Sequence, residues 1–135
     1  MVQSGGGFLM VPARFPGRAP IDAYGNGGFR FAEMSHRGSI LALPSGIEAW
    51  PVAKVEDIVT DVLGRLVEEA SSIEILLIGT GDTMSPLPKG SRAELEAAGL
   101  FPDLMSTGAA VRTYNVLLSE ERAVAAALVA VAVVR

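Results

Sequence analysis

The sequence has no cysteine and only one histidine, His36. Without cysteine the chain has no disulfide bonds, no thiolate catalysis and no Cys-ligated zinc or iron–sulfur site. A single histidine leaves little for a metal centre of another kind, so we expect neither a metal nor a cofactor. His36 stands beside Arg37 in the polar segment Ser35–Gly38, which favours a solvated turn residue over a catalytic base.

Positive charge is also scarce. The chain carries 11 Lys and Arg against 15 Asp and Glu, a net charge of −4, and no basic cluster exceeds a pair. We therefore expect neither a nucleic-acid partner nor binding to an anionic membrane surface. The most apolar stretch, residues 123–134, has about 12 residues where a bilayer crossing needs roughly 20. We expect a cytoplasmic protein that does not span the membrane.

Half of the 135 residues are hydrophobic and 19% are charged, which is typical of one folded domain with a real core. Residues 1–20 differ from the rest, because they contain Gly5-Gly6-Gly7 and three prolines. They also lack the basic-then-apolar order of a secretory signal. We interpret residues 1–20 as a flexible arm and residues 21–135 as a single α/β domain.

The chain is organised around residues 73–78, five of which are Ile or Leu. This run ends abruptly at Gly79-Thr80-Gly81-Asp82, a pattern typical of a strand that is buried on both faces and followed by a tight loop. We predict that the strand lies at the centre of a sheet. Its loop then lies at the carboxyl edge, where open α/β folds bind their ligands.

Two patterns of hydrophobic residues precede this strand. Residues 21–50 predict a β-meander with a glycine-rich connection at 25–28 and a polar turn at 35–38. Apolar residues from Val55 to Ala70 then recur at helical spacing, with charged residues on the opposite face. We predict one amphipathic helix that packs on the sheet; docking to a partner is the alternative.

After the central strand, Ser91 and Glu94 have the spacing of a capping box at a helix start, and Gly99 is placed to end that helix. Residues 103–106 predict a strand parallel to the central one, because a crossover helix joins the two.

The last third of the chain predicts a helix over residues 108–118 with Thr107 as its N-cap. Residues 123–134 stay ambiguous, because their alanines favour helix and their valines favour strand.

The two parallel strands give the candidate site. Their carboxyl ends share an edge, so the Gly-rich loop and the helix start at Thr107 face one crevice. A helix N-terminus attracts anions, and Arg112 adds a positive charge about one turn along the helix. We predict a site for a small anionic ligand. Its candidate residues are Gly79, Thr80, Gly81, Asp82, Thr107, Gly108, Arg112 and Asn115.

A purely structural role is the alternative for these residues. The glycines then serve only the turn, Thr107 only caps its helix, and Arg112 pairs with Asp82. The loop also lacks the third glycine of a dinucleotide fingerprint and the Gly-Lys-Ser/Thr ending of a P-loop. Three aspartates, Asp22, Asp82 and Asp103, are isolated in the sequence, so we assign no catalytic residue.

Several motifs together resemble a known family of small domains of unknown function, which includes the mitochondrial respiratory complex I assembly factor 3 and the adipogenesis-associated domain protein. The resemblance covers about residues 21–131. The motifs are Tyr24-Gly25-Asn26-Gly27-Gly28-Phe29-Arg30-Phe31, Leu43-Pro44-Ser45-Gly46, Trp50-Pro51, Leu77-Ile78-Gly79-Thr80-Gly81 and residues 106–118, of which the last is specific.

The resemblance implies a three-layer α/β fold with a central mixed sheet and a smaller N-terminal β layer. It also implies that residues 124–131 form the closing strand. Mitochondrial members act in building complex I, as partners of other assembly proteins at the inner membrane, and no reaction is established for the family. Here Val111 stands where many relatives have cysteine. No mitochondrial presequence is evident, and we expect a bacterial protein.

Two hypotheses follow. The first is a non-enzymatic interaction module that helps assemble a respiratory membrane complex from the cytoplasmic side, with respiratory assembly proteins as partners. The second is an enzyme or sensor for a small anionic ligand in the predicted crevice. The sequence leaves a homodimer through a sheet edge or a helix face open.

Overall fold

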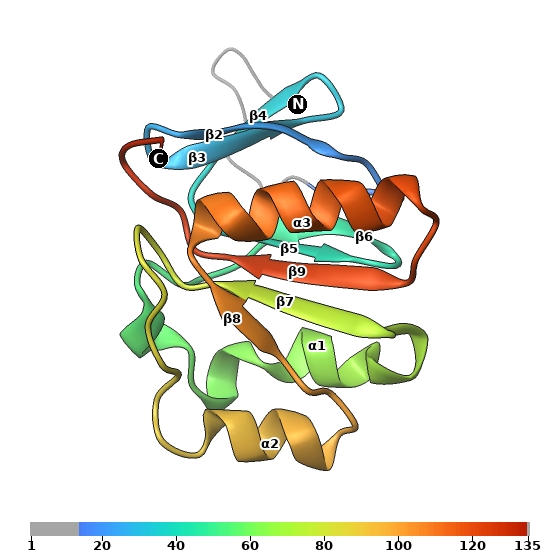
Figure 1. Ribbon diagram of the computed structural model, residues 1–135, viewed down its shortest axis with the longest axis vertical. Helices are drawn as coiled ribbons and strands as arrows, with labels where there is room; N and C mark the ends of the chain where they lie inside the picture. The colour runs from blue at the N-terminus through green and yellow to red at the C-terminus, as the bar shows by residue number, and fades with distance from the viewer. Residues whose placement is uncertain (1–13, 135) are drawn as a thin grey trace.

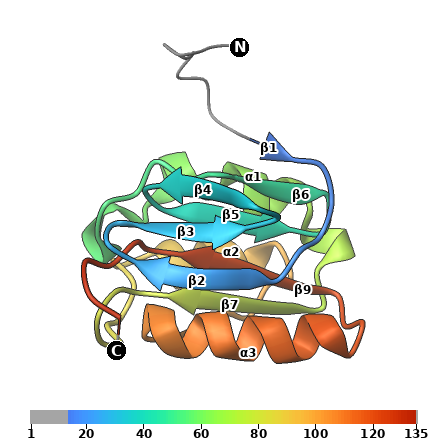
Figure 2. The ribbon, with the colours of Figure 1, turned by 90° about the horizontal axis from the view of Figure 1, so that it is seen from above.

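A computed structural model describes residues 14–134 of the chain. Its layers are stacked around a six-stranded sheet (Figure 1). A three-stranded sheet and the long helix α3 lie side by side over one face of this sheet (Figure 2), and the shorter helices α1 and α2 cover the other. The predicted three-layer α/β fold with a smaller N-terminal β layer is confirmed.

The six-stranded sheet is mixed, with the order β1-β6-β5-β9-β7-β8. The strands β7, β8 and β9 are parallel, whereas β5, β6 and β1 continue the sheet in antiparallel pairs. The bounds are β1 Arg14–Phe15, β5 Ile40–Leu43, β6 Gly46–Ala49, β7 Ile75–Gly79, β8 Asp103–Met105 and β9 Val124–Leu128. The strand predicted at the centre of the sheet is β7, which has a parallel neighbour on each side but lies next to the edge strand β8, whereas β5 and β9 are central.

Both faces of this sheet are buried, because successive side chains of a strand point to opposite faces. In β7, Leu76 and Ile78 join the core on the α1 and α2 side, whereas Leu77 joins the core under α3 and the small sheet. β9 alternates in the same way, with Ala125 and Ala127 on the first side. This double burial explains the near-continuous apolar runs in the sequence.

The predicted meander over residues 21–50 divides between two sheets. β2 (Ile21–Gly25), β3 (Gly28–Phe31) and β4 (Met34–Arg37) form the small sheet, whereas β5 and β6 join the large one. The chain changes sheet at Gly38, whose φ of +97° suits glycine. The predicted polar turn at residues 35–38 is wrong, because residues 34–37 form an edge strand whose outward side chains meet water.

The single helix predicted from Val55 to Ala70 is also wrong. The segment forms three short 3₁₀ turns, η1 Val55–Asp57, η2 Thr60–Val62 and η3 Ala70–Ser72, around one α-helix, α1 Gly64–Glu68. β-branched residues and Gly64 weaken a continuous helix here. The apolar side chains still reach the core, with Ile58, Leu63 and Leu66 fully buried, so the helical spacing correctly predicted which residues face inward.

Both predicted helix caps shift by one residue. α2 spans Ser91–Ala97 with Gly90 as its N-cap, and the Ser91 hydroxyl donates to the Ile58 carbonyl at 2.7 Å and not to its own helix. The predicted capping box is therefore absent, although Gly99 does take a positive φ after the helix. α3 spans Thr107–Ser119, and Ser106 is its N-cap, accepting a hydrogen bond from the Ala109 amide.

The ends of the chain settle one ambiguity. Residues 124–128 form β9 between β5 and β7, so the strand implied by the family resemblance is confirmed over this part. Of the arm predicted over residues 1–20, residues 1–13 lie outside the described range, and Arg14–Phe15 pairs with β6 as β1. The domain boundary at residue 20 stays a prediction.

Candidate functional site

The predicted crevice forms where β7 and β8 end together. The two strands are parallel and pair Gly79 with Met105 at their last residues, so the loop after β7 meets the start of α3. The loop and the helix are joined directly: the Thr107 amide donates to the Gly81 carbonyl at 2.8 Å. The sequence therefore correctly predicted that these two segments lie together.

Two buried threonine hydroxyls hold this junction. Thr107 Oγ1 donates to the Val129 carbonyl at 2.7 Å and accepts from the Gly81 amide at 3.1 Å. Thr80 Oγ1 lies within 2.9 Å of the Thr83 carbonyl and accepts from the Ser85 amide at 2.9 Å. Both threonines thus satisfy backbone groups that burial would otherwise leave unpaired.

Gly79 packs directly against the start of α3. A Cβ atom at this position would lie 2.8 Å from Thr107 Cα and 3.2 Å from Ala110 Cβ. Gly79 therefore allows β7 and α3 to approach closely, a packing role that is independent of ligand binding. Gly108 is buried in the first turn of the same helix.

The remaining predicted residues lie apart from the loop. Asn115 pairs with the backbone of Ile21 in both directions, at 2.9 Å each, and so docks β2 onto α3. Arg112 is exposed, and within residues 14–134 it makes no ion pair. The structure thus brings Thr80, Gly81 and Thr107 together but places Asn115 at the contact with the small sheet.

A pocket of about 290 Å³ opens beside the loop. Thr80, Gly81 and Asp82 line one side, and Lys54 and Glu56, from the start of η1, line another. This lining offers one cation and two carboxylates around exposed backbone. The site residues predicted for an anionic ligand are partly within this pocket, and ligand binding there stays a prediction.

A buried tyrosine and a partly exposed arginine network join other elements. Burial raises the pKa of Tyr114 to about 12, so its hydroxyl stays protonated and donates to the Ala19 carbonyl at 3.3 Å. On the opposite layer, Arg65 binds Glu48 of β6 at 2.9 Å and Glu69 at 2.9 Å. The hydrogen bonds that Arg65 donates to Glu48 and then to Glu68 raise the pKa of Arg65. Sequence reasoning missed the link to β6, because Glu48 is 17 residues from Arg65, whereas Glu68 and Glu69 are within one helical turn of it.

Metal-binding and membrane-crossing features are absent from the described part of the chain. No three His, Asp or Glu side chains of residues 14–134 gather as metal ligands would. None of the helices in the same range has the length and apolar character to cross a bilayer.

The partly buried His36 should make the free energy of unfolding depend on pH. Burial lowers the pKa of its imidazole below the usual 6.5, and a hydrogen bond with the Ser39 backbone partly offsets this. Below pH 6.5 the unfolded chain binds more protons than the folded one, so the contribution of His36 is present above that pH and is lost as the pH falls through the folded pKa.

We expect the free energy of unfolding, measured with urea, to fall between about pH 7.5 and 5.5, and to fall less in His36→Gln. The variant removes the imidazole but keeps a polar side chain of similar length. Equal pH dependence of the two proteins over this window would contradict the assigned role of His36.

Comparisons with known proteins agree with the expected family. The model of the family "Protein of unknown function (DUF498/DUF598)" matches residues 21–129. An uncharacterised protein of Rhodobacter capsulatus is 44% identical over 114 residues, which is 84% of this chain and 86% of that protein. The NADH dehydrogenase (ubiquinone) 1 alpha subcomplex assembly factor 3 of Xenopus tropicalis is 31% identical over 109 residues.

The match with the Xenopus protein covers 81% of this chain but only 60% of the assembly factor. Among solved structures, a Bartonella henselae protein described as an outer membrane protein is 57% identical and superposes with a TM-score of 0.82. That match covers 87% of this chain and 98% of the Bartonella chain, so nearly the whole fold is shared. From this agreement of sequence and fold, the chain belongs to the DUF498/DUF598 family of proteins of unknown function.

Proposed function

We propose that this protein is a non-enzymatic interaction module that helps assemble a respiratory membrane complex in a bacterium, acting from the cytoplasmic side. The observation that carries the proposal is the 31% identity with complex I assembly factor 3 over 109 residues. The matched part corresponds to 60% of the assembly factor, so the proposal extends only to what this part contributes.

The exposed side of α3 supports the proposal by offering a contact surface. Arg112 is exposed there, and Val116, four residues later on the same side of the helix, leaves 56% of its surface in water. An exposed cation beside an exposed apolar side chain suits a polar protein contact with a small apolar centre.

An affinity pull-down from the native host tests this proposal. The bait proteins are wild type, Arg112→Ala and the control Lys89→Ala. The control removes an exposed cation in a loop away from α3. We expect complex I subunits or assembly proteins with wild type and Lys89→Ala, and fewer of them with Arg112→Ala. Recovery of no such protein with folded wild type would contradict the proposal.

Binding of a small anionic ligand beside the Thr80 loop is the second proposal. It is favoured by the pocket of about 290 Å³ where Lys54 faces the loop that carries Asp82. Of the other predicted participants, Thr107 holds Gly81 of the loop through two hydrogen bonds, and Gly108 is buried in α3. Titration with inorganic phosphate, followed by NMR of the Gly81 and Asp82 amides, should show saturable shifts that Lys54→Gln weakens; unchanged amides would exclude this site.

A further inference from the structure

The outer face of the small sheet carries small and cationic residues. Phe29 and Phe31 of β3 point into the core, so the alternate residues Gly28 and Arg30, together with the residues paired with them on β2 and β4, point outward. The outward set shares small or cationic side chains. Its members are Ala23, Gly25, Gly28, Arg30, Ser35 and Arg37.

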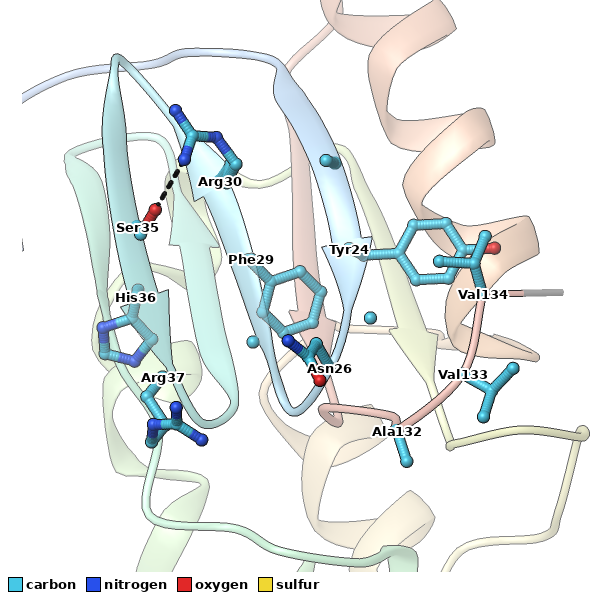
Figure 3. Close-up of a pocket in the computed structure, with 13 residues that line it drawn as sticks. Tyr24, Asn26, Phe29, Arg30, Ser35, His36, Arg37, Ala132, Val133 and Val134 are labelled. Carbon is cyan, nitrogen blue, oxygen red and sulfur yellow. Dashed lines mark hydrogen bonds between the residues drawn. The ribbon is translucent and has the colours of Figure 1, made fainter.

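This face is hollowed. A cavity of about 710 Å³ lies between the small sheet and residues 132–134, as Figure 3 shows. The volume falls within the range of small-molecule sites. Val133 and Val134 form an apolar wall and are 58% and 61% exposed. The tail is fixed beside the hairpin, because the Asn26 and Gly27 amides donate to the Ala132 and Val131 carbonyls.

The floor of the cavity is backbone. Ala23, Gly25 and Gly28 carry no atom beyond Cβ, and a Cβ at Gly28 would lie 2.1 Å from the His36 carbonyl oxygen. The peptide groups of β3 are already paired with both neighbouring strands. The floor therefore presents flat peptide surface with few free donors, which suits a flat apolar group.

Two guanidinium groups stand at the same face. Arg30 donates to the Ser35 hydroxyl at 2.9 Å, and neither Arg30 nor Arg37 forms an ion pair within residues 14–134. Arg30 of β3 pairs with Ser35 of β4, and Arg37 lies two residues after Ser35 on the same face. The two arginines are therefore diagonal neighbours, with Cβ atoms about 7 Å apart. Figure 3 shows the two arginine side chains pointing apart, so both reach one anionic group only when these long, exposed side chains rotate toward each other.

We propose that this cavity binds a small organic anion that combines a carboxylate or phosphate with a flat apolar body. Arg30 and Arg37 hold the anionic group through charge-assisted hydrogen bonds, with the Ser35 hydroxyl beside them. The body lies on the glycine floor against Val133 and Val134. The site is separate from both proposed functions above, and neither depends on it.

An NMR titration of the full-length protein tests this site. The probes are benzoate and phenyl phosphate, with inorganic phosphate and neutral benzyl alcohol as comparisons. We expect benzoate or phenyl phosphate to shift the Gly28, Ser35 and Arg37 amides saturably, and benzyl alcohol to bind at least about tenfold more weakly. The stronger of the two anions identifies carboxylate or phosphate as the preferred group. If inorganic phosphate binds as tightly as phenyl phosphate, the apolar body plays no part and the proposal fails.

Three variants separate charge from shape. Arg30→Gln/Arg37→Gln should weaken binding at least about tenfold, whereas Lys89→Gln, which removes an exposed cation in the loop before α2, should leave it unchanged. Ala23→Phe fills the floor without changing charge and should abolish the shifts. Core amides such as that of Leu77 report that each variant is folded. The proposal is overturned if the shifts persist in folded Arg30→Gln/Arg37→Gln. It is also overturned if no probe shifts these amides in the wild-type protein.

Discussion

Phe29→Ala is expected to lower the free energy of unfolding by about 3–5 kcal/mol. Phe29 is 2% exposed and lies in the core cluster that joins the small sheet to α3 and the large sheet. Its loss leaves a cavity between layers, because the flanking β-strands cannot collapse far enough to fill it. Since natural domains are stable by about 5–15 kcal/mol, this is a large fraction of the total.

Urea unfolding of Phe29→Ala, Phe29→Leu and Arg30→Ala measures this contribution. Arg30→Ala is the matched control, since Arg30 is the next residue of β3 and points outward. We expect Phe29→Leu to fall between the other two and Arg30→Ala to stay within about 0.5 kcal/mol of wild type. A loss below about 1 kcal/mol for Phe29→Ala would show that the small sheet contributes little to the core.

Gly79→Val is expected to destabilise the protein by at least about 1–3 kcal/mol through overpacking. The first added atom already lies 2.8 Å from Thr107 Cα, a backbone atom at the start of a long helix. Valine adds two further methyl groups in the same space. The strand and α3 must separate to accommodate them, and the loop that carries Thr80 moves with the strand.

Gly64→Ala is the control for this effect. No atom lies within 4 Å of a Cβ at Gly64, and the residue begins α1, where alanine favours helix. Urea unfolding should show unchanged or slightly higher stability for Gly64→Ala and a clear loss for Gly79→Val. Equal stability of the two variants would contradict the close packing of β7 against α3.

The sequence predicted those parts of the fold where one pattern has one structural solution. Five of the six residues 73–78 are Ile or Leu, and such a run before a tight glycine loop is typical of a strand buried on both faces. The parallel strand β8 was predicted because a crossover helix joins it to β7. β9 did not follow from its own residues, because three alanines between branched residues suit helix and strand alike; the family resemblance decided it.

Other segments were mispredicted for physical reasons. The spacing from Val55 to Ala70 reports which side chains face the core and does not report backbone continuity, so four short helical turns gave the same pattern as one helix. β4 is polar because it is an edge strand with an exposed face. Reading it as a turn hid the pairing of Arg30 with Ser35, and with it the basic face that Arg37 shares.

The sequence predicted where the candidate crevice lies but did not predict the hydrogen bonds of its residues. Chain order placed Thr80 and Thr107 at one sheet edge, and the structure confirms that edge. Sequence alone could not show that both hydroxyls are engaged by backbone groups, since those partners come from three separate segments: residues 81–85, Met105 and Val129. The same limit applies to Asn115, whose partner Ile21 lies 94 residues away.

Deletion of the protein in a native host that has complex I tests the proposed assembly function most directly. The measurement is native gel electrophoresis of membranes together with their NADH oxidation rate, compared among wild type, the deletion strain and the deletion strain complemented with the intact protein. The proposal predicts less assembled complex I, accumulation of smaller subassemblies and recovery on complementation. Unchanged complex I and unchanged NADH oxidation in the deletion strain would contradict it.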